Sequence, residues 1–181
     1  MQKNFRLFLF VIAWIILPIG VWLYSNLNPD APSCVYEQKS NLKYNAGCLV
    51  IMDNKILLIK HRFKNIYGIP AGTFDESDED STCTAHRETF EESFVDVKVG
   101  RELMKFPDKN FILFECHPIK RNGNGYEEIN SVDEIITMIE RNNFKSLEVG
   151  SVEMMSIEKF RNLTNYRYKD QQEAIISMLN K

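Results

Sequence analysis

The chain has 181 residues, of which 44% are hydrophobic and 26% are charged, and its formal net charge is −3 at pH 7. This composition excludes a disordered or low-complexity chain, and the acidic balance excludes a basic nucleic-acid binder, so we expect no nucleic-acid partner. The hydrophobic residues are unevenly distributed, because most of the first 24 residues are apolar. We therefore expect a membrane segment followed by one soluble domain.

The first 24 residues have the pattern of a membrane anchor. Residues 7–24 read LFLFVIAWIILPIGVWLY and contain no charged residue. As a helix this run is ~27 Å long, close to the thickness of a hydrocarbon core. The sequence therefore predicts one N-terminal transmembrane helix within residues 1–24. A cleaved signal peptide is the alternative, although the apolar run exceeds the usual length of ~7–15 residues and no A-x-A site follows it.

Basic residues indicate how this helix is oriented. Lys3 and Arg6 lie closer to the span than the first lysines after it. The positive-inside rule then places the N-terminus in the cytoplasm and the rest of the chain outside, which is the periplasm if the source is bacterial. We expect a single-pass membrane protein with an extracytoplasmic domain.

The four cysteines are Cys34, Cys48, Cys83 and Cys116. An even number is typical of exported proteins with disulfides, but these spacings form no recognisable framework. Cys48 and Cys116 lie in apolar runs, so we interpret them as buried thiols rather than as a bridge.

Residues 25–44 are polar and contain two prolines, which predicts a linker, and residues 45–181 have the size of one domain. Two runs that flank Asp53–Asn54 predict a hairpin. The remaining pattern predicts strands over 95–106, 111–117 and 152–155, and helices over 80–93, 132–141, 157–163 and 170–179. Strands and helices in this order indicate an α/β or α+β fold.

Residues 87–92 read RETFEE and carry the strongest chemical signal. On a helix Glu88, Glu91 and Glu92 are related as i, i+3 and i+4, so their carboxylates project from one face. For an arbitrary sequence, a solvated acidic face with Arg87 paired to Glu91 is the commoner explanation. The functional interpretation is a site for Mg²⁺ or Mn²⁺, since both cations prefer oxygen ligands.

The sequence around this motif resembles the box of the Nudix hydrolase family, G-x5-E-x7-R-E-U-x-E-E-x-G-U, where U is a bulky aliphatic residue. Gly72 corresponds to the first glycine, Glu79 to the first glutamate, and residues 87–88, 91–92 and 95 to the later positions. Residues 67–72 also resemble the aromatic-x-x-P-G-G segment that precedes the box. The resemblance implies an α/β/α sandwich with a mixed sheet.

The match has three departures. Six residues rather than five separate Gly72 from Glu79, Thr89 replaces the aliphatic residue, and Phe94 replaces the glycine after the helix. Because a non-glycine residue is uncommon in the left-handed conformation of a helix C-terminus, we expect this helix to end differently.

The resemblance implies a set of ligands for Mg²⁺ or Mn²⁺. Glu88, Glu91, Glu92 and the carbonyl of Ala71 would hold the ion. An acidic site can bind an anionic diphosphate only through cations that neutralise its charge. Water would then attack one phosphorus of the diphosphate.

Other residues receive supporting roles from the same resemblance. Arg87 would orient a carboxylate, and Gly72 and Glu79 would support the box loop. Either Glu88 or Glu148, which precedes the closing strand, would act as the general base, and the sequence does not choose between them.

The sequence thus predicts a membrane-anchored, metal-dependent hydrolase, a Nudix-type pyrophosphohydrolase. It would act on a diphosphate linked to another moiety, such as a nucleoside, sugar-nucleotide or lipid diphosphate. A catalytically weak module that binds a nucleotide or a headgroup is the alternative. We interpret His61 and His86 as surface histidines without a catalytic role. The basic cluster Lys60, His61, Arg62 and Lys64 is interpreted as a solvated strand end rather than a phosphate contact.

Overall fold

The computed structural model describes residues 30–123, 125–141 and 148–180. All the elements described here belong to one compact unit, residues 31–181. In chain order they are β1 (Val35–Tyr36), β2 (Asn45–Leu49), β3 (Ile51–Met52), β4 (Lys55–His61), β5 (Tyr67–Gly68), β6 (Ala71–Gly72), α2 (Ser81–Ser93), β7 (Val97–Phe106), the 3₁₀ turn η1 (Pro107–Lys109), β8 (Phe111–Asn122), β9 (Gly125–Glu128), α3 (Val132–Arg141), β10 (Val149–Ser156), α4 (Ile157–Arg161) and α5 (Lys169–Leu179). Each strand and helix predicted after residue 45 has a counterpart among them.

Sheet A has six strands in the order β1-β7-β8-β2-β6, with β9 paired to β8. β2 is parallel to β8, with Ala46 opposite Ile112, and antiparallel to β6, with Gly47 opposite Ala71. β1 is parallel to β7, and β7 is antiparallel to β8. The sheet is therefore mixed, as predicted.

Sheet B is antiparallel, in the order β10-β4-β3, with β5 paired to β4. The predicted hairpin joins β3 to β4, and its turn residues Asp53 and Asn54 have φ of 48° and 58°, as a tight two-residue hairpin turn requires. β2 leads into β3 across Val50, whose carbonyl accepts a hydrogen bond from the N–H of Leu57 at 3.0 Å. The predicted sandwich thus contains two sheets that meet at Val50, rather than one.

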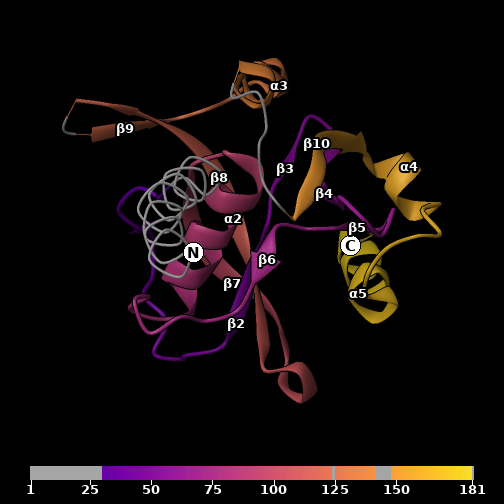
Figure 1. Ribbon diagram of the computed structural model, residues 1–181, viewed down its shortest axis with the longest axis horizontal. Coiled ribbons are helices and arrows are strands. Elements are labelled where there is room, and N and C mark those ends of the chain that lie inside the picture. The colour runs from indigo at the N-terminus through magenta and orange to yellow at the C-terminus, as the bar shows by residue number, and fades with distance from the viewer. Residues whose placement is uncertain (1–29, 124, 142–147, 181) are drawn as a thin grey trace, which may run out of the picture. The chain divides into compact units, whose positions relative to one another are not determined.

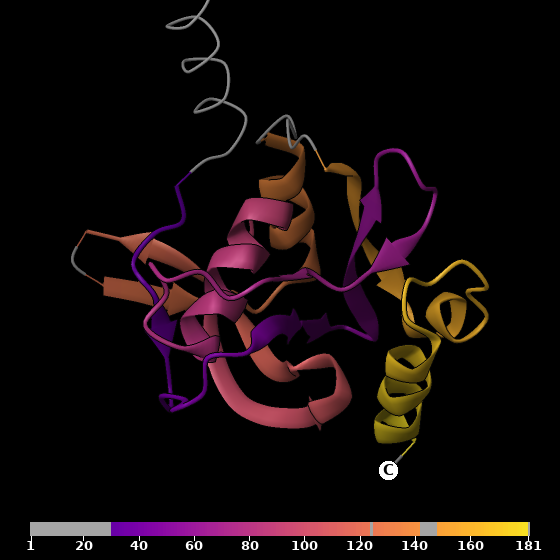
Figure 2. The same ribbon diagram turned by 60° about the horizontal axis from the view of Figure 1, so that its bottom comes forward.

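Two hydrophobic clusters form the core, one on each face of sheet A. The first packs sheet A against α2 and α3 and includes Ala46, Cys48, Ala85, Val97 and Ile135. The second packs Leu49 and Leu113 of sheet A against residues of sheet B, α4 and α5, including Leu58, Phe160 and Ile175. In Figures 1 and 2, α2 accordingly lies over β2, β7 and β8, and α4 and α5 lie beside β4 and β10. Each fully buried side chain of this kind contributes about 1.5–3 kcal/mol, so residues 31–181 contain a hydrophobic core of their own.

Residues 31–44, which we call the strap, pack on this core instead of forming the predicted linker. The carbonyl of Leu42 accepts a hydrogen bond from the N–H of Ser81 at 2.8 Å, and the N–H of Tyr44 donates to Oγ of Ser81 at 2.7 Å. The N–H of Ser40 donates to Oγ1 of Thr82 at 3.0 Å. These hydrogen bonds give the polar groups of the strap partners on α2. The compact unit therefore starts at residue 31 rather than at residue 45.

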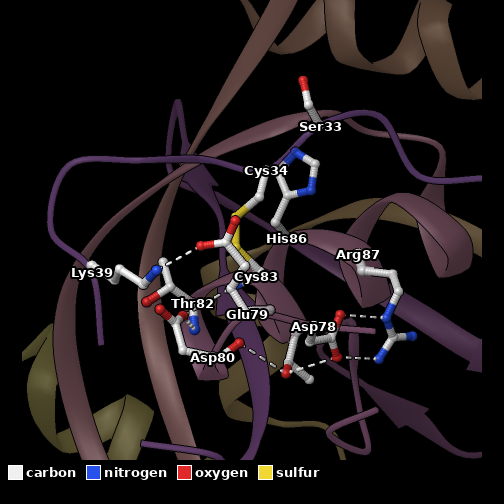
Figure 3. Close-up of a disulfide and its surroundings, with 12 residues drawn as sticks. Ser33, Cys34, Lys39, Asp78, Glu79, Asp80, Thr82, Cys83, His86 and Arg87 are labelled. Carbon is white, nitrogen blue, oxygen red and sulfur yellow. Dashed lines mark hydrogen bonds and ion pairs between the residues drawn. A yellow bond between two sulfur atoms is a disulfide. The ribbon is translucent and has the colours of Figure 1, made fainter. Parts of the chain in front are cut away.

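All four cysteines form disulfides. Cys34 of the strap bonds Cys83 of α2 (Figure 3), with 5.4 Å between their Cα atoms. Cys48 bonds Cys116, with 5.5 Å between their Cα atoms. The interpretation of Cys48 and Cys116 as buried thiols is therefore wrong. The parallel pairing of β2 with β8 brings these two apolar runs side by side, which spacing along the sequence does not reveal.

The transmembrane helix predicted within residues 1–24 lies outside the described residues. Across residues 30–123, 125–141 and 148–180, no helix is both long enough and apolar enough to cross a membrane.

Candidate active site

The helix α2 carries the predicted site, and Asp80 caps its N-terminus. Oδ1 of Asp80 accepts hydrogen bonds from the N–H groups of Thr82 and Cys83, at 2.7 and 3.3 Å. The side chain is almost fully buried, with 2% of the residue exposed. A cap of this kind stabilises a helix by about 1 kcal/mol and fixes where it starts.

Two departures from the Nudix box are accommodated within α2. Thr89 is buried, and its hydroxyl donates to the carbonyl of Ala85 at 2.7 Å, so the polar group has a partner. Phe94 adopts the left-handed conformation, with φ of 59°, and its N–H donates to the carbonyl of Phe90 at 2.8 Å. The expectation of a different helix end is therefore wrong. The left-handed conformation of a non-glycine residue costs about 1–2 kcal/mol. The contact between the Phe90 and Phe94 rings and the burial of Val95 offset this cost.

Gly72 of β6 lies directly against Glu88. A Cβ atom on Gly72 would lie 2.1 Å from the carboxyl carbon of Glu88. The absence of a side chain at position 72 is therefore what allows the carboxylate of Glu88 to approach the backbone of β6.

The neighbouring residue of β6 holds Glu92. The N–H of Ala71 donates to Oε2 of Glu92 at 2.7 Å. Glu92 is 8% exposed. Pairing of Ala71 with Gly47 of β2 fixes this part of the chain. The structure thus brings Gly72, Ala71, Glu88 and Glu92 together; the role of the Ala71 carbonyl as a metal ligand stays a prediction.

Arg87 connects the carboxylates of α2 to the loop before it. Its Nη1 lies 2.8 Å from Oε1 of Glu88 and 3.0 Å from Oε2 of Glu91. Its Nε and Nη2 each donate to one oxygen of Asp78 at 2.9 Å, and Nη2 also donates to the carbonyl of Thr73. Figure 3 shows the paired contacts between Asp78 and Arg87. Arg87 is therefore placed to orient Glu88 and Glu91.

Asp78, which the sequence analysis did not single out, is the carboxylate of this loop that contacts Arg87. It also accepts a hydrogen bond from the hydroxyl of Thr84 at 3.0 Å. Glu79 instead pairs with Lys39 of the strap, and 63% of its side chain is exposed. The sequence contained a sign of this role, since five residues separate Gly72 from Asp78, as the first spacing of the box requires. The extra residue of this box therefore lies after its first carboxylate.

Glu148 lies at the start of β10, on the surface. Its carbonyl accepts a hydrogen bond from the N–H of Arg62 at 2.8 Å, which ties it to the end of β4. Its charge acts on Glu92, whose pKa it helps to raise. The structure therefore brings Glu148 close enough to the α2 carboxylates to interact with Glu92.

The buried carboxylates have perturbed pKa values. Burial raises the pKa of Glu88 to about 6, although Arg87 acts in the opposite direction. Burial also raises the pKa of Glu92 well above its usual range, and the charges of Glu88 and Glu148 add to the shift. Glu88 and Glu92 are both desolvated, and the charge of Glu148 acts on Glu92. Additional positive charge is therefore needed to keep these carboxylates ionised.

The donor set fits a hard divalent cation. Within the described ranges, no group of three His, Cys, Asp or Glu side chains is placed to hold a metal ion. Glu88 and Glu91 instead contact Arg87. Glu88, Glu91 and Glu92 nevertheless offer only oxygen donors, the type that Mg²⁺ and Mn²⁺ bind. A bound cation would favour the ionised carboxylates that burial disfavours.

Both histidines differ from their interpretation as surface residues. His86 is 1% exposed, and its Nε2 lies 3.0 Å from Oδ1 of Asp96. His61 is half-buried, and its Nε2 lies 3.4 Å from Nη1 of Arg167. Helix periodicity placed His86 on α2 but did not reveal that sheet A covers it.

Comparisons with known proteins agree with this architecture. A family model described as the NUDIX domain matches residues 41–172. Among solved structures, a NUDIX hydrolase from Nitrosomonas europaea is 13% identical with a TM-score of 0.50, and the match covers 77% of this chain and 90% of that chain. An ADP-ribose pyrophosphatase from Streptococcus suis is 14% identical with a TM-score of 0.47, covering 76% and 91%. A bifunctional NMN adenylyltransferase/ADP ribose pyrophosphatase from Francisella tularensis, complexed with AMP and a Mn ion, is 19% identical with a TM-score of 0.48, covering 92% and 45%.

A comparison with curated proteins finds no match. The family model nonetheless spans well over half of the sequence and contains the box, the helix α2 and every described strand except β1. The chain therefore belongs to the NUDIX domain family, and the prediction of a Nudix-type pyrophosphohydrolase is confirmed at the level of that family.

Proposed function

We propose that the protein is a Mg²⁺- or Mn²⁺-dependent hydrolase that cleaves a diphosphate linked to another moiety. The observation that carries this proposal is the burial of Glu88 and Glu92 against the backbone of β6, where their charges repel each other. Such a pair is costly unless it serves to hold a cation. A cation held there would in turn hold an anionic diphosphate.

Each residue of the site has a proposed task. Glu88, Glu91 and Glu92, with the carbonyl of Ala71, would hold the ion. When bound, the ion supplies neutralising charge and polarises the P–O bonds of the diphosphate. Arg87 keeps Glu88 and Glu91 in place through its own contacts with Asp78.

The general base must accept a proton from the attacking water, and two carboxylates remain candidates. Glu88 lies against the backbone of β6 and is held there by Arg87, so it would stand beside the ion and its water. Glu148 is more exposed than Glu88, and its charge helps to raise the pKa of Glu92. If Glu148 is the base, Glu148→Gln removes the acidic limb of the pH–rate profile; if Glu88 is the base, that limb persists in Glu148→Gln.

We also propose that residues 1–24 anchor the protein in a membrane and that the domain is extracytoplasmic. The apolar run and the flanking Lys3 and Arg6 support the anchor. The two disulfides support an oxidising compartment, since such bridges are rare in reducing cytosol. A topology reporter fused after Lys181 tests this, and a cytoplasmic signal would contradict it. The substrate would then be a diphosphate at or near a membrane, including a lipid diphosphate.

The function is tested on residues 31–181 with a panel of nucleoside, sugar-nucleotide and lipid diphosphates. We expect hydrolysis that requires Mg²⁺ or Mn²⁺ and stops with a chelator. Glu92→Gln should lower kcat at least about a hundredfold, because it removes a cation ligand. Glu79→Gln is the matched control, since Glu79 is exposed and pairs with Lys39. Binding of a diphosphate with Mg²⁺ but no product would instead support the binding module.

A further inference from the structure

Phe63 is the most exposed large hydrophobic residue of the described chain. Its exposed fraction is 86%, whereas the next, Tyr126, reaches 44%. Phe63 lies in the loop between β4 and β5, residues 62–66, which we call the β4–β5 loop. A phenyl ring placed this far into water forgoes the stabilisation that burial gives, and no residue of the described domain covers it.

The β4–β5 loop is held in place by backbone contacts. The N–H of His61 donates to the carbonyl of Ile66 at 2.9 Å, which closes the loop at its base. The side-chain Nδ2 of Asn165 donates to the carbonyl of Asn65 at 2.7 Å, and the backbone N–H of Arg62 donates to the carbonyl of Glu148. Phe63 is therefore presented outward from a fixed position.

The surroundings of Phe63 are basic, although the chain as a whole is acidic. Residues 54–74 contain no Asp or Glu, and Arg62 and Lys64 flank the ring directly. Lys60 precedes the loop, and Arg167 reaches it through His61. The charges of Arg167 and Lys64 both act on His61, and Glu148 opposes them.

We propose that the β4–β5 loop is a membrane-contact surface that inserts Phe63 into the interfacial region of an anionic lipid bilayer. Arg62 and Lys64 would bind lipid phosphates on either side of the ring. Aromatic rings favour the headgroup level of a bilayer, and cations near the surface are attracted to anionic lipids. This proposal does not depend on the hydrolase activity proposed above.

The geometry favours a lipid surface over a protein partner. A stable protein interface covers about 800 Å² on each side around an apolar centre, whereas here a single exposed ring lies between Arg62 and Lys64 in the chain. A bilayer needs only a protruding apolar group with basic flanks. Because the N–H of Arg62 donates to the carbonyl of Glu148, such a contact would bring Glu148 close to the lipid surface.

The test uses residues 31–181, which contain the complete core and lack both tryptophans of the chain, Trp14 and Trp22. Phe63→Trp then provides a single fluorescent reporter at the loop. With vesicles of phosphatidylglycerol and phosphatidylcholine in equal parts, we expect its emission to shift to the blue and to be quenched by brominated lipid. Tyr126→Trp is the matched control, because Tyr126 also lies on an exposed hairpin but is followed by Glu127 and Glu128.

Binding strength is measured by sedimentation with the same vesicles. Phe63→Ala should weaken binding about tenfold, since it removes the inserted ring. Lys64→Gln should weaken it about fivefold, and added salt should weaken it further. Each variant must keep the melting temperature of the unchanged fragment.

Three results would overturn the proposal. The first is an unchanged emission of Phe63→Trp with anionic vesicles. The second is an equal shift of Tyr126→Trp, which would mean that the whole surface adheres. The third is a blue shift that grows with protein concentration in the absence of lipid, which would place a second copy of the chain over Phe63.

Discussion

Asp78 connects the loop before α2 to the chemistry on α2. It receives two hydrogen bonds from Arg87 and one from Thr84. Burial opposes its charge, but the bonds from Arg87 hold the pKa of Asp78 below its usual range. Asp78 therefore stays ionised at neutral pH and fixes the guanidinium of Arg87 between loop and helix.

Asp78→Asn should lower kcat about tenfold to a hundredfold with little change in KM. The neutral side chain holds Arg87 less firmly, so Arg87 no longer keeps Glu88 and Glu91 in place; losses of this size are typical when a partner of a metal ligand is removed. Steady-state kinetics on the best diphosphate of the panel measures the change, with Glu79→Gln as control. Equal losses in the two variants would show that both carboxylates support the loop.

Counting residues could not decide between Asp78 and Glu79. Asp78 keeps the first spacing of the box and Glu79 keeps the second. The sequence therefore shows that one residue is inserted, but it does not show on which side of the first carboxylate the insertion lies. The decision comes from packing, because Thr84 and Arg87 approach Asp78 while Lys39 draws Glu79 outward. By contrast, the grouping of Glu88, Glu91 and Glu92 followed directly from helix periodicity.

The strap is an element that the sequence did not predict. The apolar patterns of α2, α3 and α5 are local and gave these helices correctly. The strap depends on contacts between residues some forty positions apart, such as Ser40 with Thr82. Its polar groups find partners only once α2 is in place, so composition alone indicated a linker.

The two disulfides should differ in their response to a dithiol. Cys34 is half-buried, whereas Cys48 and Cys116 are 0% and 3% exposed. Cys34–Cys83 should therefore open first in the folded protein, as alkylation followed by mass spectrometry would detect. The Cys34→Ser/Cys83→Ser double variant should lose about 3–4 kcal/mol of unfolding free energy, since the bridge closes a loop of 49 residues. Reduction of both bridges at one rate would show that the core opens as easily as the strap.

At the scale of the whole molecule, the net charge of −3 hides a separation of charge. Acidic residues gather on and before α2, while residues 54–74 are free of them. The separation was visible in the sequence. Its consequence was not, because only the two-sheet fold places the β4–β5 loop beside Glu148. The meeting of the sheets at Val50 likewise depends on pairings between distant strands.

Asp96 joins three parts of the molecule. Its Oδ1 lies 3.0 Å from Nε2 of His86 on α2, and its Oδ2 lies 2.6 Å from Nε of Arg121 on β8. Arg121 in turn donates to the hydroxyl and the carbonyl of Ser33 in the strap. Loss of charge on Asp96 should therefore loosen helix, sheet and strap together.

Burial opposes the charge of Asp96, but hydrogen bonds from His86 and Arg121 hold its pKa below the ordinary value of 3.8. A carboxyl with a lowered folded-state pKa stabilises the fold above its unfolded-state pKa, and this contribution disappears as the pH falls through the folded-state pKa. Asp96→Asn should thus lower the unfolding free energy by about 2 kcal/mol at pH 7, and the difference from the unchanged protein should vanish as the pH falls through the lowered folded-state pKa of Asp96. Urea unfolding of residues 31–181 across this range measures both curves. Asp170→Asn is the control, since Asp170 is exposed and pairs with Lys109 at the surface. A difference that persists where Asp96 is protonated in both the folded and the unfolded state would mean that its charge is not what stabilises the fold.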